Sequence, residues 1–141
     1  MITEEICTYE VAKLAKEKGF NKEVFAYYDC EGDLAYVVSP YRGSSIIEIL
    51  VDKNKQNPIG AEYTSAPTQT LLQKWLREEK GYAISVTAYP TLAAMGKVCY
   101  AWEIKSSSDG HYMKAIDGER TFSTYEQALE DALKYSLENL I

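Results

Sequence analysis

The stretch that decides the fold is Thr68-Gln-Thr-Leu-Leu-Gln-Lys-Trp-Leu-Arg-Glu-Glu-Lys80, which is followed by Gly81. Its apolar residues share one face of a helix, as their spacing shows: Leu71, Leu72, Trp75 and Leu76. Pro67 is tolerated in a first helical turn, and Gly81 suits the left-handed conformation that often ends a helix. We therefore expect a helix over 68–80 with Trp75 buried.

Two segments after Gly81 alternate between opposite faces, which is the pattern of a β-hairpin. Pro90 ends the first segment, and a loop over 91–97 separates it from the second. The larger side chains are expected to face the helices: Tyr82, Ile84, Val86, Ala88, Val98, Tyr100, Trp102 and Ile104. The opposite face is small and flat, and we take it as a candidate interface: Ala83, Ser85, Thr87, Cys99 and Ala101.

The flanking segments predict further helices and strands. A helix is expected over 3–18 with Thr3 as its cap, and another over 123–139, where Ser123-Thr-Tyr-Glu126 matches a capping box. A hairpin is expected over 23–29 and 34–39, a short strand over 111–116, and a loop over 53–64. The fold class is therefore α+β: a mostly antiparallel sheet with helices packed on one face, whose C-terminal lobe reads α-β-β-β-α.

The length and composition indicate one packed domain. A chain of 141 residues with 46% hydrophobic and 12% aromatic side chains can bury a sizeable core without metals or disulfides. We expect a single domain over 1–141, with an N-terminal lobe of about 1–60 and a helix–hairpin–helix lobe of about 64–141. The sequence does not fix the structure of residues 39–64.

Charge and cysteine usage indicate the setting. Cys7, Cys30 and Cys99 are widely spaced and odd in number, which favours reduced thiols and a cytoplasmic location. The N-terminus lacks the basic leader and apolar core of a signal peptide, and no apolar run reaches the ~20 residues of a membrane span. The net charge of −6 disfavours nonspecific binding to nucleic acids.

The sequence assigns no catalytic, metal-binding or cofactor-binding residue. His111 is the single histidine, and no orienting third group accompanies it. The acidic turn at 29–33 has glycine at its fourth position, whereas a calcium loop requires glycine at the sixth. No glycine-rich phosphate loop is present. We therefore expect no cofactor, and a small enzyme remains only an alternative.

A nucleic-acid-binding module is a second alternative. The order helix, three strands, helix also occurs in double-stranded RNA-binding domains, which grip phosphates with basic residues at the start of the last helix. The corresponding segment here, Thr124–Asp131, is acidic. Lys74, Arg77 and Lys80 alternate with glutamates and read as a solvated helix face. Spacing places Tyr100 and Trp102 toward the core instead of on a stacking platform.

Three blocks of sequence resemble a family of small uncharacterised proteins found in phage genomes and mobile elements of gut bacteria. The blocks are Glu10-Val-Ala-Lys-Leu-Ala-Lys-Glu-Lys-Gly-Phe20, Ser65-Ala-Pro-Thr-Gln-Thr-Leu-Leu-Gln-Lys-Trp-Leu-Arg-Glu78 and Phe122-Ser-Thr-Tyr-Glu-Gln-Ala-Leu-Glu130. The resemblance spans most of the chain, and the segment 39–55 departs most from it. It implies a phage-type origin and a small cytoplasmic protein, and it assigns no activity and no functional residues.

These observations together favour a non-enzymatic interaction protein. The expected partner is a protein of the host or of the phage, and the small-residue face is the expected contact surface. A second copy of the chain, or residues 1–60, could equally cover that face. Neither a membrane nor a nucleic acid is expected as a partner.

Overall fold

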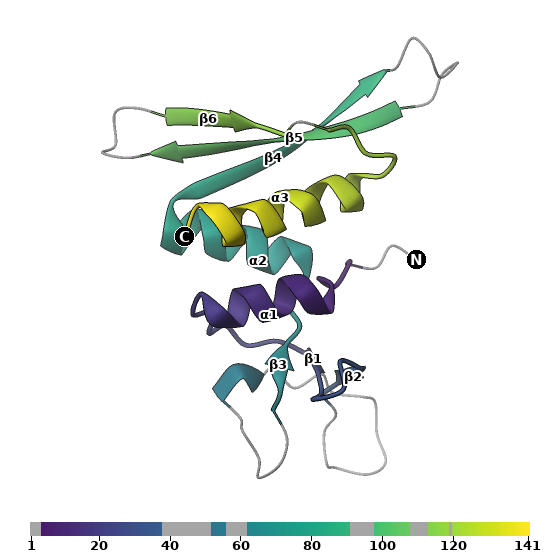
Figure 1. The fold of residues 1–141 in the computed structure, drawn as a ribbon, viewed down its shortest axis with the longest axis vertical. Coiled ribbons are helices and arrows are strands. Elements are labelled where there is room, and N and C mark those ends of the chain that lie inside the picture. The colour runs from purple at the N-terminus through teal and green to yellow at the C-terminus, as the bar shows by residue number, and fades with distance from the viewer. Residues whose placement is uncertain (1–3, 38–51, 56–61, 91–97, 108–112, 119) are drawn as a thin grey trace. The chain divides into compact units, whose positions relative to one another are not determined.

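A computed structural model describes residues 4–37, 52–55, 62–90, 98–107, 113–118 and 120–141. It contains three α-helices and two antiparallel sheets within these ranges, which confirms the α+β prediction (Figure 1). The chain divides into two compact units. We call residues 6–68 the N-terminal unit, and residues 1–5 with 69–141 the C-terminal unit. The prediction of a single domain stays a prediction.

The N-terminal unit combines one helix with a small sheet. Helix α1 spans Tyr9–Glu17, and the sheet has the order β2–β1–β3, with β1 at Ala26–Tyr28, β2 at Leu34–Tyr36 and β3 at Thr64–Ser65. The predicted hairpin is confirmed, although its strands are shorter than 23–29 and 34–39. Seven apolar side chains are buried in this unit's first half: Cys7, Val11, Ala12, Ala15, Phe20, Val24 and Ala26.

The first helix begins at Tyr9, so the prediction of a helix from residue 3 was wrong. Residues 5–7 are extended instead, because their backbone pairs with a distant segment. The Cys7 N–H donates to the Pro67 carbonyl at 2.9 Å, and the Gln69 N–H donates to the Glu5 carbonyl at 2.8 Å. Thr8 caps α1 by accepting from the Val11 N–H at 3.4 Å. Thr3, the predicted cap, lies outside the described residues.

The predicted loop over 53–64 was also wrong in part. A short 3₁₀ helix, η1, spans Lys53–Lys55, and Thr64 begins β3, which pairs with β1. Ser65 is buried although it is polar, because Asn54 forms hydrogen bonds with its N–H and its hydroxyl. The Ser65 N–H donates to Asn54 Oδ1 at 2.8 Å, and the Asn54 N–H lies 3.1 Å from Ser65 Oγ. Reciprocal bonds of this kind allow a polar residue to be buried in β3, which is an edge strand paired only with β1 in the described residues.

The acidic turn between β1 and β2 is stabilised by a side chain that bonds its own backbone. Asp29 Oδ1 accepts from the Glu31 N–H at 2.9 Å and from the Asp33 N–H at 3.0 Å. Such a turn needs an oxygen acceptor at this position but no negative charge. The arrangement therefore accounts for Asp29 without a metal ion.

Asp29→Ala is expected to lower the free energy of unfolding of the N-terminal unit by about 1 kcal/mol, because both turn bonds are lost. Asp29→Asn, which keeps the oxygen acceptor, should lose less than half as much. Thermal denaturation followed by circular dichroism measures both. Equal losses for the two variants would show that the carboxylate charge is what the turn requires.

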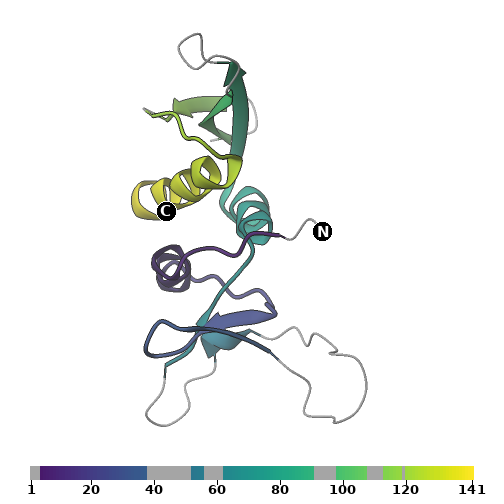
Figure 2. The same ribbon diagram turned by 90° about the vertical axis from the view of Figure 1, so that its right-hand side faces the viewer.

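The C-terminal unit is a three-stranded antiparallel sheet with two helices on one side (Figures 1 and 2). Its strands are β4 (Tyr82–Pro90), β5 (Val98–Ser107) and β6 (Met113–Asp117), with β5 in the centre. Helix α3, Tyr125–Asn139, packs directly on β4 and β5, and α2, Gln69–Trp75, packs beside α3. The predicted third strand is confirmed by β6, whereas His111 lies outside the described residues.

The predicted helix over 68–80 is present, but its last turn is wider than an α-helix. Residues Leu76–Lys80 form a π-helical turn, η2, which ends where the N–H of Gly81 bonds to the Leu76 carbonyl. Gly81 has a φ of 79°, the left-handed conformation that the sequence predicted. Leu72, Trp75 and Leu76 are buried as expected. Gln69 is buried as well, and its amide donates to Glu130 Oε2 of α3 at 2.8 Å.

The last helix is capped one residue later than predicted. Thr124, not Ser123, is the N-cap, and its hydroxyl accepts from the Gln127 N–H at 3.1 Å. The buried face of α3 is lined mainly by alanine and leucine: Ala128, Leu129, Ala132, Leu133, Ser136 and Leu137. Thr8-Tyr-Glu and Thr124-Tyr-Glu therefore begin two helices in the same way, each with threonine as N-cap. No helix among the described residues is long and apolar enough to cross a membrane.

Candidate functional site

The candidate interface lies on the face of the C-terminal sheet opposite the helices. The strand register places Thr87 beside Ala101 and Tyr89 beside Cys99, so residues of both strands meet on this face. Ser85 and Thr87 are exposed, while Ala83, Cys99 and Ala101 are half-buried. The five predicted residues are therefore brought together by β4 and β5. We refer to them as the small-residue face.

Larger groups flank the small-residue face at its two ends. Tyr89 is 51% exposed at one end, beside Cys99. Ser85 lies beside Glu103 at the other end, and Ala83 lies beside Lys105. The Lys105 ammonium approaches the Glu103 carboxylate to 3.3 Å, so the two opposite charges compensate each other locally. The five small residues are themselves uncharged, and Asp117 of β6, which is exposed beside Glu103, adds a negative charge at this end.

Only part of the opposite face of the sheet belongs to the core, because Ala88 and Val98 of the predicted helix-facing set are exposed. Ile84, Trp102 and Ile104 are buried there, and the Trp102 indole N–H donates to Asp131 Oδ2 of α3 at 2.8 Å. Tyr100 is half-buried, with its ring in an edge contact with Tyr125 at 6.2 Å. Trp102 is thus confirmed as a core residue, whereas Tyr100 is only partly enclosed. The burial of Trp102 leaves its indole no free face for stacking on a base.

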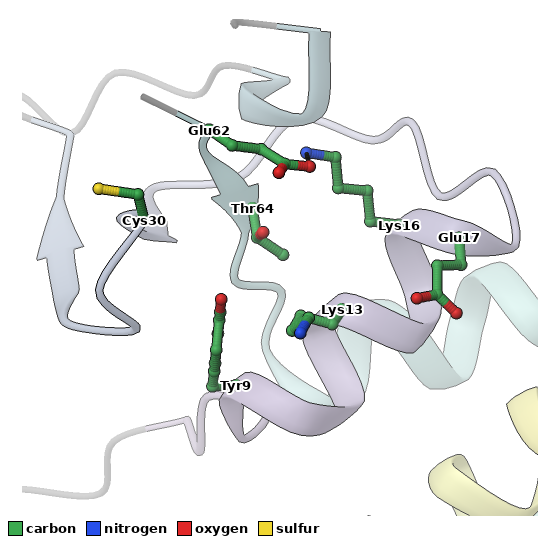
Figure 3. Close-up of a pocket in the computed structure, with 7 residues that line it drawn as sticks. All are labelled: Tyr9, Lys13, Lys16, Glu17, Cys30, Glu62 and Thr64. Atoms are coloured by element: carbon green, nitrogen blue, oxygen red, sulfur yellow. Dashed lines mark hydrogen bonds and ion pairs between the residues drawn. The ribbon is translucent and has the colours of Figure 1, made fainter. Parts of the chain in front are cut away.

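A hollow lies in the N-terminal unit. Its volume is about 160 Å³, and Figure 3 shows its seven lining residues: Tyr9, Lys13, Lys16, Glu17, Cys30, Glu62 and Thr64. Its charged groups are Lys13, Lys16 and Glu17 of α1, together with Glu62 near β3. The Lys16 ammonium donates to Glu62 Oε1 at 2.9 Å and to the Tyr63 carbonyl at 2.8 Å. Lys13 lies over the Tyr9 ring at 5.3 Å from its centroid.

The ion pair in this hollow changes the titration of Glu62. The hydrogen bond from Lys16 holds the pKa of the Glu62 carboxyl below its ordinary value, and the Coulomb attraction of Lys16 lowers that pKa further. A carboxyl with a lowered pKa stabilises the folded state above its ordinary pKa. That contribution is lost as the pH falls through the lowered pKa. The ion pair therefore adds stability at neutral pH that is lost in acid, whereas the bond from Lys16 to the Tyr63 carbonyl does not require Glu62.

Lys16→Met is expected to raise the pKa of Glu62 toward that of a free glutamate, because both favourable effects of Lys16 disappear. Lys13→Met is the matched control, and it should raise the pKa less, since Lys13 makes only a weak Coulomb contribution. Carbon-detected NMR titration of the side-chain carboxyls measures both. Equal shifts in the two variants would contradict the assignment of the bond to Lys16.

The size of the hollow limits what it can bind. Pockets for drug-sized molecules and cofactors usually enclose about 300–1,000 Å³. At about 160 Å³ this hollow fits only a group about as large as benzene. One of its two lysines is already bonded to Glu62. In the described ranges no three histidine, cysteine or acidic side chains converge as metal ligands.

Sequence reasoning did not find this hollow. Lys16 and Glu62 are separated by 46 positions, and no sequence pattern links the two. Gln73 was also missed, although its side-chain amide donates to the Ile84 carbonyl at 2.9 Å. Only the contacts of the folded chain reveal such pairs. Comparison with protein-family models, curated proteins and solved structures finds no match to this chain.

Proposed function

We propose that this chain is a non-enzymatic interaction module of phage or prophage type, which binds a host or phage protein through the small-residue face. The observation that carries the proposal is the placement of this face. The two helices lie on the opposite side of the sheet, and Ser85 and Thr87 are exposed in the middle of β4. Small side chains let a partner approach the backbone closely, which favours a flat, uncharged protein surface as the partner.

Two further observations support this setting. All three cysteines are free thiols, in keeping with action in a reducing cytoplasm. The family resemblance in three blocks of sequence supports a phage-type origin. The nucleic-acid alternative finds less support, because Glu126, Glu130 and Asp131 make the start of α3 acidic. The small-enzyme alternative would have to use the hollow at Lys16 or residues outside the described ranges.

The experiment compares partner capture by three forms of the full chain. Ala101→Lys places a charge in the centre of the small-residue face, and Thr70→Lys places the same charge on an exposed position of α2. A partner captured by the wild-type chain is purified and titrated with each form. We expect Ala101→Lys to weaken binding about 10-fold or more, because a desolvated charge without a partner is costly, and Thr70→Lys to leave it unchanged.

Two results would contradict the proposal. In the first, both lysine variants bind the partner as tightly as the wild type, which would place the contact elsewhere. In the second, the chain captures no protein but binds labelled duplex RNA or DNA at ~50 mM salt, where phosphate contacts are strongest. The second result would favour the nucleic-acid alternative.

A further inference from the structure

Strand β4 is an edge strand with an unusual composition. The sheet order β4–β5–β6 leaves one side of β4 without a neighbouring strand in the described residues (Figure 2). Its sequence, Tyr82-Ala-Ile-Ser-Val-Thr-Ala-Tyr-Pro90, holds no charged side chain. Proteins usually protect long edge strands with charges, bulges, proline or a covering segment, because an open edge pairs with other strands. The middle of β4 has no charged side chain and no proline.

Hydrogen bonds of the neighbouring strands show which backbone groups point to the free edge. The carbonyl of Trp102 accepts from Gly118 at 2.9 Å, and Tyr100 exchanges bonds with Phe122, so both β5 residues point away from β4. Their partners Val86 and Ala88 therefore point away from β5, since the two residues of an antiparallel pair share this property. The N–H and C=O groups of Val86 and Ala88 thus lie along the free edge.

The two ends of this edge differ from its middle. Ile84 has the same orientation as Val86, but its carbonyl already accepts the Gln73 side-chain amide at 2.9 Å. Pro90 also shares the orientation, and as a proline it has no N–H to donate. No backbone bond outside the sheet ladder reaches Val86 or Ala88 in the described part of the chain. Between Ile84 and Pro90, the unused groups are therefore those of Val86 and Ala88, the Ile84 N–H and the Pro90 carbonyl.

We propose that β4 pairs antiparallel with β4 of a second copy of this chain, about a two-fold axis at Thr87. This register places Val86 opposite Ala88 of the second copy, and Ile84 opposite its Pro90. Val86 and Ala88 exchange both of their bonds. The Ile84 N–H bonds to the opposite Pro90 carbonyl. The Ile84 carbonyl is already bonded to Gln73, and it lies opposite Pro90 of the second copy, which has no N–H to offer.

The match of every unused group between Ile84 and Pro90 favours a second copy over an unrelated strand. An unrelated peptide has no reason to carry proline opposite Ile84, whereas the chain supplies it by symmetry. The register also places Thr87 opposite Thr87 and Ser85 opposite Tyr89 of the second copy, with no like charges in contact. The two sheets join into one, and their small-residue faces become continuous. The inference stands independently of the proposed partner.

The experiment uses the symmetry of the axis. Thr87 is exposed, so Thr87→Lys and Thr87→Glu should fold, but each places like charges directly opposite each other in the dimer. Sedimentation velocity over a concentration series should show a wild-type dimer and self-association weakened about 10-fold or more in each variant. An equimolar mixture of the two variants should dimerise again, because lysine then lies opposite glutamate.

Ala101→Lys provides the matched control, since it places lysine on the same face one strand away from the edge. It should leave the dimer intact while weakening partner binding, so the dimer and the proposed function are tested separately. Three results would overturn the inference: a monomeric wild type at all concentrations, a dimer unaffected by Thr87→Lys, or a mixture that stays monomeric. A monomer that binds an extended peptide along β4 would reassign the edge to a foreign strand.

Discussion

Replacement of Trp75 by alanine is expected to lower the free energy of unfolding of the C-terminal unit by about 3–5 kcal/mol. The Trp75 side chain is only 3% exposed, and it is buried on the same face of α2 as Leu72. Removing an indole from such a site loses its transfer free energy and leaves a cavity that the surrounding helices cannot fully close. The effect is a large share of the stability of a small domain.

The chain itself supplies a probe for this measurement. It holds two tryptophans, so the Trp75→Ala variant retains Trp102 as its single indole fluorophore. Trp102 lies in the same unit, and urea unfolding followed by its fluorescence reports on that unit directly. Lys74→Ala, which changes the exposed neighbouring position, should alter the free energy by less than about 0.5 kcal/mol. A similarly small loss for Trp75→Ala would contradict the buried position.

The parts of the fold that were predictable are those set by local periodicity. The alternation in 82–89 and 98–105 correctly predicted which residues share a face, since the side-chain period of a strand is two. Burial of Leu72, Trp75 and Leu76 followed from helical spacing in the same way. The shift of the α3 cap from Ser123 to Thr124 shows the limit of such signals. Both residues can cap a helix, and Thr124 is the cap because its hydroxyl accepts from the Gln127 N–H.

The parts that failed depend on contacts between distant segments. Residues 5–7 lie in the segment predicted to be helical, yet they are extended because Glu5 and Cys7 bond to Gln69 and Pro67. Thr64 looks like the end of a polar loop, yet it pairs with Tyr28 of β1, and the buried Ser65 beside it is bonded to Asn54. The small-residue face was predictable because both of its strands show the pattern locally. The edge of β4 was not, because its free groups are defined by the bonds of β5 and by Gln73.

Trp102→Ala is expected to lower the free energy of unfolding by about 3–5 kcal/mol, as at Trp75. Here the role of the ring can also be tested through its neighbour Gly118. Trp102 is 5% exposed, and its ring lies against Tyr135 with centroids 5.2 Å apart. Its bond to Asp131 contributes less than its packing, because Arg120 still approaches that carboxylate to 3.5 Å and water can reach it. Urea denaturation followed by circular dichroism measures the loss.

A substitution at Gly118 tests whether the Trp102 ring occupies the space beside this residue. A Cβ added at Gly118 would lie 2.7 Å from Cε2 of Trp102, so Gly118→Ala should cost about 1–3 kcal/mol by overpacking. In the Trp102→Ala background the same methyl group enters vacated space, and its cost should largely disappear. The double variant should therefore be more stable than the sum of the single losses predicts. Strict additivity would show that the cost of the added methyl group does not come from the Trp102 ring.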